Sequence, residues 1–114
     1  MKEIFQKLVL QLIQDIGDVS WRKSVLEIMR LKGTVRFSAT YLDTKNEIHN
    51  VETNFGFWEA KLVHNLYDIT QNEAPIHKNW NRAKLSLLPG GKMQIEYLWD
   101  QELEDEVDRY NNES

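Results

Sequence analysis

The sequence predicts an α+β fold, in which an antiparallel β-sheet of about five strands has helices packed on one face. Two segments place apolar residues at the 3.6-residue period of an amphipathic helix. Several others alternate apolar and polar residues, as half-buried strands do. Two of these alternating segments flank Pro89-Gly90-Gly91, a sequence typical of a hairpin turn. The expected order is α-β-β-β-α-β-β-α, in one domain spanning residues 1–114.

An amphipathic helix is expected at the start of the chain. Gly17 predicts its end, because glycine readily adopts the left-handed conformation that terminates helices. A membrane-surface role for this helix is disfavoured, because only Lys2 and Lys7 offer positive charge. Its apolar stripe consists of Ile4, Phe5, Leu8, Val9, Leu12, Ile13 and Ile16.

Three strands in a meander are predicted next. From Trp21 the chain changes character, and the dense apolar run at 25–31 predicts the first strand, with a turn at Lys32-Gly33. Clean alternation over 34–41 predicts the second strand. Polar turn residues at 43–46 lead to a weaker strand at 47–51, which we expect at an edge of the sheet.

Helical spacing returns at 57–69, with Asn54 as a residue of the N-cap region. The polar stretch at 70–75, which ends in proline, predicts a break and a loop. We expect the core-facing stripe to contain Trp58, Leu62, Val63, Leu66 and Ile69.

The hairpin around Pro89-Gly90-Gly91 is expected to anchor the sheet, and a short helix at 101–110 should follow it. That helix has only Leu103, Val107 and Tyr110 at helical spacing, so a narrow stripe would dock it. In the first strand of the hairpin, Ala83, Leu85 and Leu87 should face the core. In the return strand, Met93, Ile95, Tyr97 and Trp99 alternate with Gln94, Glu96 and Leu98, and we expect Met93, Ile95 and Tyr97 to face the core as well. The opposite, open face of the sheet would carry Thr34, Arg36, Ser38, Thr40, Lys84, Ser86, Gln94 and Glu96.

Charge is unevenly distributed. The net charge is −4, and residues 100–114 contain seven of the 18 acids but one of the 14 Lys and Arg residues. The nearly neutral body disfavours a nucleic-acid binder, which needs a concentrated basic surface. The N-terminus lacks a signal-peptide core, and no window is apolar enough to span a membrane. We therefore expect a cytoplasmic protein without a membrane partner.

No catalytic, cofactor or metal motif is recognisable. The chain has no cysteine, and His49, His64 and His77 form no metal-binding spacing. A Ser/His/Asp triad has no supporting signature. The loop at 88–92 lacks phosphate-loop spacing and precedes a strand. We therefore predict no enzyme, no cofactor and no metal site.

The acidic run is the strongest surface feature. Glycoside hydrolysis needs two carboxylates across a cleft, and an EF-type Ca²⁺ loop needs its glycine; the run provides neither. It is either a solvated terminus or a recognition surface for a cationic partner. In the second case, the partner-binding residues are Trp99, Asp100, Glu102, Glu104, Asp105, Glu106 and Asp108.

These features together resemble the YezG-like immunity (antitoxin) family, whose members neutralise polymorphic bacterial toxins. The likeness covers nearly the whole chain. Family members often have Tyr-x-Tyr before the acids, where this chain has Tyr97-Leu98-Trp99. The similar motifs are Ile16-Gly17-Asp18-Val19-Ser20-Trp21 with Glu27-Ile28-Met29, the helix with Trp58, Leu62 and Leu66, and Trp80-Asn81-x4-Leu85 followed by Gly91-Lys92-Met93-x-Ile95-x-Tyr97 and acids.

The resemblance implies an immunity protein that binds a cognate toxin domain, often a nuclease, delivered by a contact-dependent or specialised secretion system. Two alternatives remain open from the residues. One is a ligand-binding or enzymatic domain that uses the open face around Arg36, Thr40, Lys84 and Glu96. The other is a nucleic-acid binder that uses Lys23, Arg30, Lys32, Arg36 and Lys84.

Overall fold

The computed structural model describes residues 2–31, 34–73 and 79–112. Its order of elements is the predicted one. The expected turn at Lys32-Gly33 and most of the loop before Trp80 lie outside the described residues. The elements are α1 (Lys2–Ile16), β1 (Trp21–Leu31), β2 (Thr34–Asp43), β3 (Ile48–Val51), α2 (Phe57–Glu73), β4 (Arg82–Leu87), β5 (Met93–Leu98) and α3 (Gln101–Asn112).

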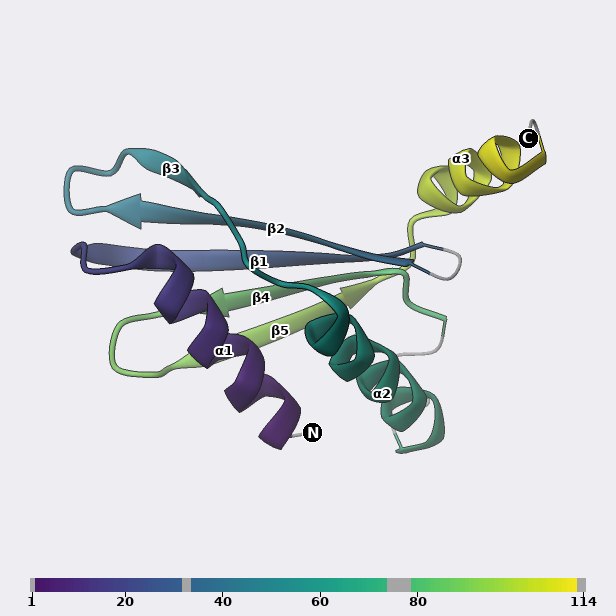
Figure 1. The fold of residues 1–114 in the computed structure, drawn as a ribbon, viewed down its shortest axis with the longest axis horizontal. Coiled ribbons are helices and arrows are strands. Elements are labelled where there is room, and N and C mark those ends of the chain that lie inside the picture. The colour runs from purple at the N-terminus through teal and green to yellow at the C-terminus, as the bar shows by residue number, and fades with distance from the viewer. Residues whose placement is uncertain (1, 32–33, 74–78, 113–114) are drawn as a thin grey trace.

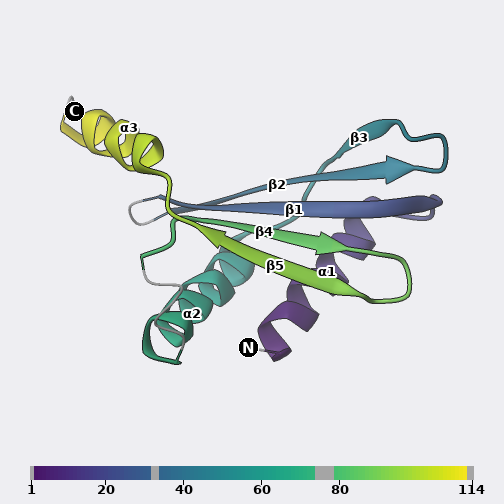
Figure 2. The ribbon, with the colours of Figure 1, turned by 180° about the vertical axis from the view of Figure 1, so that it is seen from behind.

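The five strands form one antiparallel sheet in the order β3-β2-β1-β4-β5. The α+β fold class is therefore confirmed, with β1 at the centre and β3 at an edge. Helices α1 and α2 cover one face of the sheet (Figure 1). Helix α3 instead extends beyond the end of the sheet, apart from α1 and α2, as the view from behind also shows (Figure 2).

The register of the strands places the apolar residues on the covered face. Leu26 of β1 lies opposite Ala39 of β2 and Leu85 of β4, and both neighbours are buried with it. Leu8 and Leu12 of α1 and Val63 and Leu66 of α2 complete this core, each fully buried. Burial of these side chains supplies most of the driving force for the fold.

Trp80 closes the core where the chain enters β4. Its side chain is 1% exposed, and its Nε1–H donates to Oγ1 of Thr70 at 2.8 Å. The rings of Tyr67 and Tyr97 lie 5.5 and 5.1 Å from it, centroid to centroid. The guanidinium of Arg30 lies 3.3 Å from the centroid of Tyr67 and donates through Nη1 to the carbonyl of Trp80 at 2.6 Å. This cluster joins β1, α2, β4 and β5.

The glycine turns have the expected geometry. Gly17 has φ +83°, and its N–H donates to the carbonyl of Ile13, which ends α1 as predicted. Gly90 and Gly91 have φ +96° and +92° in the β4–β5 turn. The N–H of Leu88 donates to the carbonyl of Lys92 across that turn at 2.8 Å. Side chains with a Cβ rarely adopt this conformation, so the turn requires glycine.

Two details of α2 differ from the expectation. The helix continues past Ile69 to Glu73, because Thr70 is buried and bonded to Trp80 rather than placed in a loop. Asn54 does not cap it: Asn54 donates through its backbone N–H and its side chain to the carboxylate of Asp15. The N-cap is Gly56, whose carbonyl accepts the first helical hydrogen bond, from the N–H of Ala60. The N–H of Gly56 donates to Oε2 of Glu59 at 2.9 Å, which is one of the two hydrogen bonds of a capping box.

Trp58 was expected in the core stripe, and that expectation is wrong. Its side chain is 71% exposed, whereas Val63 and Leu66 further along the helix are buried. Helical period determines which side of a helix a residue lies on, but not whether another element covers it there. The same limit applies in α1, where Ile13 is 43% exposed.

None of the helices in the described parts of the chain is long and apolar enough to cross a membrane.

Replacing Thr70 by Val should lower the free energy of unfolding by about 1–3 kcal/mol, because the buried indole N–H of Trp80 loses its acceptor. Urea denaturation followed by circular dichroism measures this. Thr70→Ser, which keeps the hydroxyl, should lose much less stability. The matched control is Thr44→Val at an exposed turn position. Equal losses in the Val and Ser variants would contradict a role for the hydrogen bond.

Candidate functional site

Helix α3 carries most of the predicted partner-binding residues, and Asp100 determines where it begins. Asp100 is the N-cap: its Oδ1 accepts from the N–H of Leu103 at 3.2 Å. Its Oδ2 accepts from Nε of Arg82 on β4 at 2.7 Å. Asp100 thus fixes the first turn of α3 and ties it to the sheet. The structure therefore gives this carboxylate an internal role, although the sequence predicted it as a partner-binding residue.

Asn81 forms the second link between the sheet and α3. It is 2% exposed, and its side chain bonds to the backbone of Asp100 twice. Nδ2 donates to the carbonyl of Asp100 at 2.8 Å, and Oδ1 accepts from its N–H at 2.7 Å. The backbone of Asn81 bonds Leu98 and Arg30 in turn. A buried amide with all these partners holds the β5–α3 junction in one conformation.

The pKa of Asp100 is lowered from its ordinary value, chiefly by the hydrogen bond from Arg82 and also by the N–H of Leu103. Both donors favour the charged form of the carboxyl group. The ionised form of Asp100 therefore stabilises the docked position of α3.

Trp99 lies at the entrance to α3 and is 43% exposed. Its Nε1–H donates to Oε1 of Gln101 at 3.0 Å, and Nε2 of Gln101 donates to Oδ1 of Asp105 at 3.0 Å. This chain of bonds holds the indole against the first turn of the helix, with much of the ring open to solvent.

The remaining predicted residues divide into two groups. Glu104 is half-buried and lies near Arg30, whose pKa is lowered by burial, an effect that Tyr67, Asp68 and Glu104 partly offset. The other four lie exposed along α3, while Leu103 is buried and Val107 half-buried on the docked side. We call these four the acidic face: Glu102, Asp105, Glu106 and Asp108.

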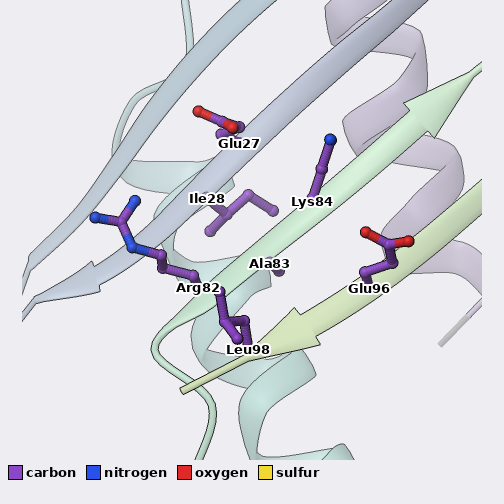
Figure 3. Close-up of a pocket in the computed structure, with 7 residues that line it drawn as sticks. All are labelled: Glu27, Ile28, Arg82, Ala83, Lys84, Glu96 and Leu98. Atoms are coloured by element: carbon purple, nitrogen blue, oxygen red, sulfur yellow. The ribbon is translucent and has the colours of Figure 1, made fainter. Parts of the chain in front are cut away.

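The open face of the sheet carries the predicted polar residues, together with the half-buried Val25 and Met29. Cross-strand register aligns Glu27, Lys84 and Glu96 in one row. Figure 3 shows these three side chains on neighbouring strands, around a hollow of about 130 Å³ that Arg82 and Leu98 also line. A second hollow, beside Ser38 and Thr40, measures about 210 Å³. Both are smaller than typical small-molecule pockets, which occupy roughly 300–1,000 Å³.

The four described residues among those considered for nucleic-acid binding do not form a continuous basic surface. Arg30 lies under Tyr67 beside the core, whereas Lys23, Arg36 and Lys84 alternate on the open face with Glu27 and Glu96. Lys32 lies outside the described residues.

The β2–β3 turn brings together Asp43, Glu47 and His49, which the sequence did not group. Their potential ligand atoms lie within 4.8 Å of one another. Asp43 Oδ1 accepts from the N–H groups of Lys45 and Glu47, and Oδ2 accepts from Nε2 of His49 at 2.8 Å. The bond from His49 is the main reason that the pKa of Asp43 is lowered. The hydrogen bonds to Asp43 close the β2–β3 turn, and they explain why the three side chains lie together.

Sequence reasoning missed the anchoring role of Asn81 and the exposure of the aromatic residues at the start of α2. A signal existed for Asp100, because an Asp directly before a helical segment is a favoured N-cap. No comparable signal exists for Asn81, whose partner lies 19 residues away.

No family model matches this chain, and no curated protein matches it.

The difference in stability between the wild type and Asp100→Asn should depend on pH. An unfolded Asp titrates near about 3.9, whereas the folded pKa is lower. The stabilisation is therefore fully present above the unfolded value and is lost as pH falls through the folded one. Urea titrations from neutral to strongly acidic pH test this. The exposed Asp18→Asn is the control. A difference that does not change with pH would contradict the role of the ionised carboxylate.

Proposed function

We propose that this chain is a protein-binding module of the immunity type, which binds a toxin domain with a basic surface and blocks it without catalysis. The observation that carries this proposal is α3. It extends beyond the end of the sheet in both views (Figures 1 and 2), and four of its carboxylates are exposed. The resemblance to YezG-like immunity proteins points to the same class of function.

Electrostatics explain how such a helix would act. A nuclease binds phosphates with Lys and Arg, so its substrate site is basic. The acidic face offers carboxylates at helical spacings that imitate a row of phosphates. Long-range attraction raises the association rate, and complementary charges set the orientation of the complex. A toxin held in this way is blocked because its substrate site is covered.

Rigidity and an aromatic anchor add to this attraction. The N-cap and Asn81 fix α3 before binding, so little conformational entropy is lost on association. Trp99 is half open to solvent, with its indole oriented by Gln101. Tryptophan is enriched among residues that dominate interface energy. We therefore assign the central contact to Trp99 and the surrounding charge pairs to the acidic face.

The alternative of a small-ligand site on the open face has less support. Its two hollows are shallow, and the larger measures about 210 Å³. Lys84, which the alternative requires, lies in a row between Glu27 and Glu96. No observation on this face points to a particular ligand.

The function is tested by co-expression. The chain is produced together with the variable C-terminal domain of a toxin encoded next to its gene, and cell survival is measured. Survival with the chain, death without it, and a purified stoichiometric complex are the expected results. Death in the presence of the folded chain, with no complex on mixing, would reject the proposal for that toxin.

Removing three of the four charges of the acidic face by Asp105→Asn, Glu106→Gln and Asp108→Asn should slow association with the toxin about tenfold at low salt and flatten its salt dependence. The fold should be unaffected, because all three residues are exposed. Stopped-flow or surface-plasmon kinetics at several salt concentrations measure both effects.

A matched control removes three exposed acids elsewhere, by Glu3→Gln, Asp18→Asn and Glu52→Gln. It has the same change in net charge, so it separates general charge from the acidic face. Equal kinetics in the two triple variants would show that the acidic face has no specific role.

A further inference from the structure

Two large aromatic side chains lie uncovered at the start of α2. Phe57 is 75% exposed and Trp58 is 71% exposed. Their rings are in edge-to-face contact, with centroids 5.6 Å apart. An exposed apolar pair of this size is typical of an interaction site rather than of ordinary surface. The proposed function does not use these residues.

Phe57 also forms one wall of a groove between α2 and β2. Its apolar floor comes from Val35, Phe37 and Phe55, and the rings of Phe37 and Phe55 lie 4.8 Å apart. The groove has a volume of about 480 Å³. We call this the α2–β2 groove, lined by Thr34, Val35, Phe37, Phe55, Gly56, Phe57, Ala60, Lys61 and His64.

The rim of the α2–β2 groove carries the positive charge of Lys61. Lys61 and His64 lie on the α2 side, and the lining residues that the structure describes include no carboxylate. Nζ of Lys61 lies 5.8 Å from the centroid of the Trp58 ring. Glu59, the nearest acid along the helix, accepts a bond from the N–H of Gly56. An occupant that fits both floor and rim has an apolar anchor next to carboxylates.

We propose that the α2–β2 groove binds the segment from Trp99 to Asp108 of a second copy of this chain. That segment has the required chemistry. Trp99 is 43% exposed and its neighbour Leu98 is 59% exposed, and the acidic face follows directly. Within one chain, α3 extends away from α2 (Figures 1 and 2), so the contact forms between copies. Two reciprocal contacts about a two-fold axis make a closed dimer.

The dimer covers the same acidic face to which we assign toxin binding, so the toxin and the second copy compete. The inference does not rest on the proposed function, because self-association is measured without a toxin. Failure of toxin protection therefore leaves it intact, and a monomeric chain leaves the proposed function intact.

Sedimentation equilibrium on the full chain over a wide concentration range tests the dimer. The wild type should dimerise, and more weakly as salt rises. Two variants should each raise the dissociation constant about tenfold or more. One is Lys61→Glu, which reverses the charge at the groove. The other is the triple variant Asp105→Asn, Glu106→Gln and Asp108→Asn, which removes three of the negative charges of α3. Lys92→Glu, an exposed charge reversal in the β4–β5 turn, is the control and should dimerise like the wild type.

Mixing the two defective variants gives the decisive result. Lys61→Glu retains an intact α3, and the triple variant retains an intact groove. A mixture therefore contains one intact contact per heterodimer and should associate more strongly than either variant alone. A monomeric wild type, association unaffected by Lys61→Glu, or a mixture no stronger than its components would each overturn the inference.

Discussion

Asn81 is the residue on which the relation between sheet and helix α3 depends. It is buried between the Trp80 cluster and the end of β5, and four hydrogen bonds link it to Arg30, Leu98 and Asp100. Asp100 adds the bond from Arg82 and the N-cap of α3. Because the described side chains of α3 bury little beyond Leu103, these polar contacts hold it in place.

The arrangement separates stability from recognition. Apolar burial on one face of the sheet stabilises the body, and polar anchoring positions an exposed helix beyond it. Within the acidic run, Asp100 bonds to Arg82, and Glu104 is half-buried near Arg30. The four exposed carboxylates of the acidic face are therefore the ones available to a partner. The α2–β2 groove, with Lys61 at its rim, is the complementary surface of the same molecule.

Several features followed directly from the sequence, and the structure confirms them. Alternation in β2 and in the β4–β5 hairpin identified most of the core-facing residues, because strand period 2 leaves only two possible faces. Met93 was also expected in the core, and that expectation is wrong, since its side chain is 39% exposed at the start of β5. Gly17, Gly90 and Gly91 identified turns, because their backbone conformations suit few other residues. The extent of α2 and the position of Trp58 were not predicted, because both depend on which element lies opposite.

The sequence by itself therefore determined the elements, their order and the acidic character of the last segment, since local period, turn chemistry and charge are properties of neighbouring residues. The tertiary structure alone decided which acids are exposed, that Asn81 and Arg82 anchor α3, and that Phe57 and Trp58 border a groove. These features arise from contacts between residues that are distant in the chain. Asn81 and Asp100 are 19 positions apart, and the sequence around them does not show that they will be hydrogen-bonded. The pairing of β4 with β5 brings them together.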